Sequence, residues 1–91
     1  MASLASFQNK SDFLSAEIPI ATSGTARVFV NMPIYGVGAV SILFKNSAAQ
    51  FIPYPGLTFT AGAAVQLPVI AGDVIKVRFA GCNGAGIEVD Q

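Results

Sequence analysis

Apolar and polar residues alternate along most of the chain with a period of two, which is the period of a β-strand. The clearest case is the segment 74–79, in which apolar residues face one way while Lys76 and Arg78 face the other. The same alternation occurs over residues 25–32, 37–44 and 57–60, and each segment is predicted to be a strand with one buried face. The residues predicted to face the core are Ala26, Val28, Val30, Met32, Val40, Ile42, Phe44, Leu57, Phe59, Ile75, Val77 and Phe79.

Glycine and proline separate these segments at intervals that suit short antiparallel strands. Pro19, Pro53 and Pro68 lie inside strand-like runs but lack the N–H of a ladder, so those runs are predicted at sheet edges, strand starts or bulges. The dipeptide Asn83–Gly84 favours a type I′ turn and predicts a hairpin between the last two strands. Only residues 61–64 suit a helical turn, so almost no helix is expected.

These features predict an all-β fold, either a small antiparallel β-sandwich or a jelly-roll-like barrel. A chain of 91 residues can bury one modest core, so residues 13–91 are predicted to form a single β-domain. Residues 1–12 show no convincing period and are interpreted as an extended N-terminal arm. The halves before and after Asn46 have similar apolar content, and they could form two facing sheets.

Charged residues make up only 11% of the chain, against about 25% in an average soluble domain, and the formal net charge is zero. Such a surface lacks the repulsion that keeps small domains apart, which predicts a homo-oligomer or another assembled state. The basic residues are scattered, so nucleic-acid binding is not expected. No apolar run is long enough for a membrane helix, and the first residues do not resemble a secretion signal.

The sequence contains no histidine, one cysteine and five scattered carboxylates, which is a poor supply of acids, bases and nucleophiles. We therefore predict that the protein is not an enzyme and assign no catalytic, cofactor-binding or metal-binding residues. Cys82 is interpreted as a small side chain near a turn, and Asp73 as a turn residue that accepts backbone N–H groups. Glu88 and Asp90 could share a strand face toward a cation, although solvated terminal charges explain them as well.

Two tyrosines are candidates for partner binding. Tyr35 precedes a glycine and Tyr54 lies between two prolines, so both are predicted on loops where a ring could stack on a sugar or contact a protein. A carbohydrate- or ligand-binding β-module is therefore an alternative function. A third alternative is an enzyme inhibitor or a subunit of a larger complex, with the loop Ile52–Gly56 as the recognition element.

The predicted arm offers a second set of candidate partner-binding residues. An arm that becomes ordered on a neighbouring subunit gains contact area without enlarging the core. The apolar side chains expected to anchor it are Leu4, Phe7 and Phe13.

The segment 59–89, FTAGAAVQLPVIAGDVIKVRFAGCNGAGIEV, resembles small β-rich structural proteins of tailed-bacteriophage virions in its layout. The corresponding features are the aromatic-threonine strand at Phe59, the Leu67–Val69 strand, the Ala71–Gly72 turn and the closing turn at Gly84–Gly86. The resemblance covers about a third of the chain, and no residue matches a specific capsid-contact motif.

The resemblance implies a capsid decoration or cement protein that binds the outside of a phage head by non-covalent contacts. It implies the major capsid protein or another virion protein as partner, self-association with a trimer as the first expectation, and location in the virion after synthesis in the host cytoplasm.

Overall fold

The computed structural model describes residues 3–32 and 38–91, with the side chains of Tyr54 and Pro55 outside that description. Within these residues the secondary structure consists of strands and turns, without a helix. The strands are β1 (Ser3–Lys10), β2 (Phe13–Leu14), β3 (Ile18–Pro19), β4 (Gly24–Asn31), β5 (Ala39–Lys45), β6 (Phe51–Phe59), β7 (Ala63–Val69), β8 (Val74–Ala80) and β9 (Ala85–Asp90).

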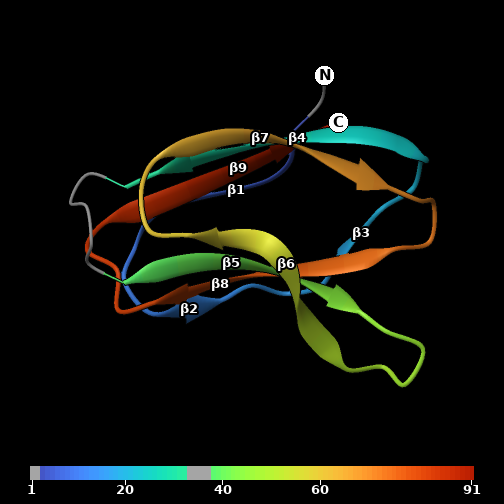
Figure 1. The fold of residues 1–91 in the computed structure, drawn as a ribbon, viewed down its shortest axis with the longest axis horizontal. Helices are drawn as coiled ribbons and strands as arrows, with labels where there is room; N and C mark the ends of the chain where they lie inside the picture. Colours follow the sequence, from blue (N-terminus) through green and yellow to red (C-terminus); the bar gives the residue numbers. More distant parts are fainter. Residues whose placement is uncertain (1–2, 33–37) are drawn as a thin grey trace.

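The strands form two antiparallel sheets that pack face to face (Figure 1). The first sheet has the order β1-β9-β4-β7, and the second has the order β2-β8-β5-β6 with β3 also paired to β8. The prediction of an all-β sandwich is therefore confirmed. The two halves of the chain do not form one sheet each, because strands from before and after Asn46 are interleaved in both sheets.

The segments β2 and β3 are one edge strand interrupted by a bulge. Leu14 pairs with Arg78 and Ile18 with Ile75, so four steps on this strand oppose three on β8. Ser15 bridges the interruption, since its N–H donates to the Val77 carbonyl and its hydroxyl oxygen accepts the Val77 N–H, both at 2.9 Å.

The pairings define a jelly roll when β2 and β3 are counted together. The first strand pairs with the last (β1 with β9), the second with the second-last (β2 and β3 with β8), then β4 with β7 and β5 with β6. Two further pairings, β4 with β9 and β5 with β8, join these hairpin arms into the two sheets. This nested pairing, rolled into two sheets, is the eight-stranded jelly-roll arrangement.

The core lies between the sheets and is built from the alternation seen in the sequence. All residues predicted to face inward are buried except Phe44, which is half-buried and packs against the same cluster. Leu43 is an exception of the opposite kind, because it points away from the core yet is only 7% exposed. Its cross-strand partners are Pro53 on β6 and Lys76 on β8, whose aliphatic groups can shield it from water.

The three prolines lie where their missing N–H groups predict. Pro19 is in β3, Pro53 in β6 and Pro68 in β7, and each of these strands is at an edge of its sheet. An edge strand has one side without a neighbour, so the absence of a donor there leaves no partner unsatisfied.

The predicted N-terminal arm is wrong for residues 3–10, which form β1 and pair with β9 along the first sheet. The register shifts between Ser3 and Ala5 and again between Phe7 and Lys10, and Asn9 has a φ of 58°. These irregularities break the period of two, which is why the alternation does not identify this strand in the sequence.

The predicted hairpin between the last two strands is also wrong. β8 belongs to the second sheet and β9 to the first, so residues 81–84 cross from one sheet to the other. A type I′ turn requires a positive φ at both central residues, whereas Gly84 has one, at 71°, and Asn83 does not. The backbone N–H of Cys82 instead donates to the Ser11 carbonyl at 3.0 Å, which ties this crossing to the β1–β2 connection.

Candidate interaction surfaces

The predicted arm anchors pack against their own chain. Leu4, Phe7 and Phe13 are half-buried and adjoin the core cluster. The Phe7 and Phe13 ring centroids are 5.3 Å apart, and Phe13 lies 6.1 Å from Phe79 in the core. Aromatic pairs at these separations stabilise the fold they belong to. These three side chains therefore stabilise the N-terminal edge of the sandwich, and only their exposed parts are accessible to a partner.

The two predicted tyrosines differ in how far the structure describes them. Tyr35 lies outside the described residues. Tyr54 belongs to β6 instead of a loop, and its side chain lies outside the description. The proposed recognition loop Ile52–Gly56 is likewise part of β6, and Ile52 is 48% exposed.

The cysteine and the carboxylates considered in the sequence analysis occupy positions that the fold explains. Cys82 is buried in the core cluster, with its Sγ 3.4 Å from the Ala39 carbonyl oxygen. Asp73 accepts the Ile70 N–H at 2.9 Å, as predicted for a turn aspartate. Glu88 and Asp90 do share one face of β9, where they are aligned with Phe29 and Arg27 of β4. Within residues 3–32 and 38–91, no three metal-binding side chains come together.

Four large apolar side chains are exposed on the described surface, which singles them out as candidate contacts. Sequence reasoning proposed a role for only one of them, Ile52. The signal for Phe29 was present, because this aromatic residue interrupts the polar face that Arg27 and Asn31 form on β4. The four residues are Leu14 on β2, Phe29 on β4, Ile52 on β6 and Ile70 after β7.

A shallow hollow lies beside Phe29 on the first sheet. It has a volume of about 170 Å³ and is lined by Arg27, Phe29, Ala64, Val65 and Gln66 of the neighbouring strands β4 and β7. The Arg27 guanidinium carbon is 5.9 Å from the Phe29 ring centroid. A volume of roughly 150 Å³ holds a benzene ring, so the hollow has the size of one side chain.

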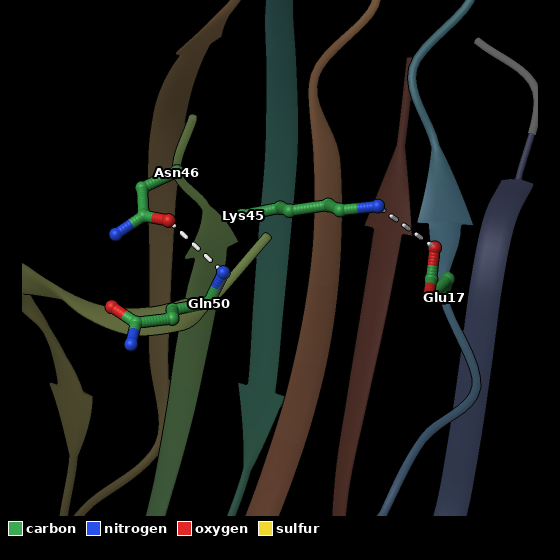
Figure 2. Close-up of polar contacts among 4 residues, drawn as sticks. All are labelled: Glu17, Lys45, Asn46 and Gln50. Atoms are coloured by element: carbon green, nitrogen blue, oxygen red, sulfur yellow. Dashed lines mark hydrogen bonds and ion pairs between the residues drawn. The ribbon is translucent and has the colours of Figure 1, made fainter. Parts of the chain in front are cut away.

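The hairpin formed by β5 and β6 extends beyond the body of the sandwich at its lower right in Figure 1. Asn46 stabilises the turn at its end, because its side-chain oxygen accepts the Gln50 N–H at 2.9 Å (Figure 2). The same oxygen accepts the Ala48 N–H at 3.0 Å. The Lys45 Nζ lies 3.9 Å from the Glu17 Oε1 (Figure 2). An ion pair exposed in this way contributes at most about 1 kcal/mol to the stability of the fold. The hairpin thus carries the exposed Ile52 on β6, close to a turn that hydrogen bonds stabilise.

The strand order is that of a small jelly roll. The described surface carries four exposed apolar side chains and a shallow hollow as candidate contacts. Comparison of the chain with protein-family models, with curated proteins and with solved structures finds no match. Among the described residues there is no helix long and apolar enough to cross a membrane.

Proposed function

We propose that this protein is a non-enzymatic virion structural protein of the capsid decoration or cement type, which binds a phage head through non-covalent contacts. Its partner is the major capsid protein or another virion protein. The observation that carries the proposal is the jelly-roll strand order, because viral capsid domains commonly have this architecture. Because a fold alone does not define a function, the exposed side chains of the surface are the second support for the proposal.

The surface supports association with protein. Ile70 is 68% exposed and Leu14 is 55% exposed, and burial of a large aliphatic side chain contributes about 1.5–3 kcal/mol. With charged residues at 11% of the chain, few solvated charges must be stripped of water when another surface approaches. A cement protein that covers these side chains against a shell would resist separation of the shell subunits.

A carbohydrate- or ligand-binding module is the second candidate, and the hollow beside Phe29 is the feature that favours it. Jelly rolls also occur in lectins, and an exposed aromatic ring flanked by Arg27 and Gln66 can stack on a sugar while donating hydrogen bonds. Pockets for small molecules usually enclose roughly 300–1,000 Å³, however, and the hollow holds about 170 Å³. Its size therefore favours a single side chain from a protein over a separate ligand.

The location of the native protein tests the proposal. A lysate of the cells that naturally express the gene is centrifuged through a density gradient, and an antibody against this chain locates it in the fractions. We expect the protein to travel with phage particles and to leave them in denaturant without reduction or proteolysis. Recovery of all the protein at the top of the gradient, apart from intact particles, would exclude a virion role.

A further inference from the structure

The free edges of the two sheets differ in how well they are protected. An unpaired edge attracts another strand unless proline, charge, a bulge or shortness prevents it. In the second sheet, β2 and β3 are two residues long each, while β6 contains Pro53 and shifts register against β5. In the first sheet, β1 shifts register twice and carries Lys10.

The strand β7 has the least protected edge. It pairs with β4 in an unbroken register over its whole length, from Ala63 to Val69, and it contains no charged residue. Its single proline, Pro68, is close to one end. Residues 63–67 therefore form a regular, uncharged edge, and no other strand of residues 3–32 and 38–91 pairs with its outer side.

Pro68 also indicates which backbone groups of β7 are free. A proline is tolerated in an edge strand when its nitrogen faces away from the neighbouring strand. Because N–H groups alternate in direction along a strand, those of Ala64 and Gln66 face the same way as the Pro68 nitrogen, away from β4. Two donors and two acceptors are thus available in the middle of the edge.

We propose that β7 pairs antiparallel with β7 of a second copy of this chain, around a two-fold axis at Val65. In this register Ala64 lies opposite Gln66 of the second copy, and those residues exchange backbone hydrogen bonds. Ala63 lies opposite Leu67 of the second copy. Small residues thus meet large ones on both faces of the joined sheet, which matches the packing of cross-strand pairs.

The hollow and the charge of the chain support a second copy as the occupant. Gln66 of the second copy comes to lie beside Ala64, so its side chain fills the hollow next to Phe29 in each subunit. A net charge of zero and a strand without charged residues keep the repulsion across the axis small. Two-fold pairing closes at two copies, whereas the resemblance to phage proteins implied three.

The mass of the purified chain, measured by sedimentation equilibrium over a range of concentrations, tests the pairing. We expect a dimer of twice 9.4 kDa that dissociates on dilution. Ala64→Lys places two ammonium groups in the joined hollows, near both Arg27 residues, and should raise the dissociation constant at least about tenfold. Ser6→Lys, which adds the same charge at an exposed site on the edge strand β1, should leave it unchanged.

A cross-link tests the register. Residues opposite each other at a non-hydrogen-bonded antiparallel position have Cα atoms about 4.5 Å apart, which a disulfide can span. Val65→Cys should therefore give a disulfide-linked dimer under mild oxidation, and Ser6→Cys should not. A monomer at all concentrations, a closed trimer, or a dimer that Ala64→Lys leaves intact would each overturn the proposal. These measurements use the purified chain without particles, so their failure would leave the proposed virion role to its own test.

Discussion

Replacement of Gly38 by alanine should destabilise the protein by about 3–5 kcal/mol, a large part of the stability of a small domain. Gly38 has a φ of +77°, and a Cβ atom placed on it would clash with the Gly81 carbonyl carbon and the Ala80 carbonyl oxygen. Both are backbone atoms, so relief requires the connection between β8 and β9 to move away from the start of β5. Urea unfolding followed by circular dichroism measures the loss.

Gly72→Ala is the matched control for this substitution. Gly72 also has a positive φ, +99°, but nothing lies within 4 Å of the position of its Cβ. Its replacement should cost only the backbone strain, about 1–2 kcal/mol. The difference between the two variants isolates the close approach of residues 38 and 81. If both variants lost the same free energy of unfolding, the predicted clash of the added Cβ at residue 38 would be contradicted.

Replacement of Ser15 by alanine should lower the free energy of unfolding by about 1–3 kcal/mol. The Ser15 hydroxyl is the acceptor for the Val77 N–H and donates to the Ala16 carbonyl, and Ser15 is only 3% exposed. Alanine leaves a buried N–H in the centre of the second sheet without its acceptor. Native-state hydrogen exchange should show faster exchange of the Val77 amide.

Ser41→Ala removes the same kind of hydroxyl group from β5 of the same sheet and serves as the comparison. Ser41 is 3.4 Å from the Thr58 hydroxyl in an exposed contact, so its loss should change stability by less than about 0.5 kcal/mol. Equal destabilisation by the two substitutions would contradict the bridging role assigned to Ser15.

The parts of the fold that local alternation determines could be predicted from the sequence. Val28 and Val30 on β4, and Ile75 and Val77 on β8, are buried as their spacing requires. These strands are regular, and a shift of one residue would expose the entire apolar face, so the pattern identifies both the strand and its inner side. The edge positions of the prolines follow equally directly from their missing N–H groups.

The parts that depend on distant contacts could not be predicted in this way. The close approach of Gly38 and Gly81 joins two connections that are far apart in the chain. The strand predicted over residues 37–44 therefore includes Gly38, whereas β5 begins at Ala39. The sequence Asn83–Gly84 suits a hairpin locally, but β9 is held between β1 and β4, and these pairings outweigh the preference of a short turn. The bulges in β1 concealed that strand for a similar reason, since register shifts interrupt the alternation.

The candidate contact surfaces were the least predictable feature. Exposure of Ile70 and Leu14 depends on where the β7–β8 turn and the interrupted edge strand lie, which the sequence alone does not define. Phe29 could be assigned to a polar strand face, but the hollow beside it exists because Ala64, a small residue of β7, is its cross-strand neighbour. The hollow is therefore created by the pairing of β4 with β7, which no local sequence pattern indicates.

The heat resistance of phage particles tests the proposal that this chain stabilises a phage head by adhesion. Particles made with and without the gene are warmed in parallel, and release of their DNA is followed with an intercalating dye. We expect particles lacking the protein to release DNA at a lower temperature, and addition of the purified chain to restore the resistance. Identical release curves for the two kinds of particle, with or without added protein, would contradict it.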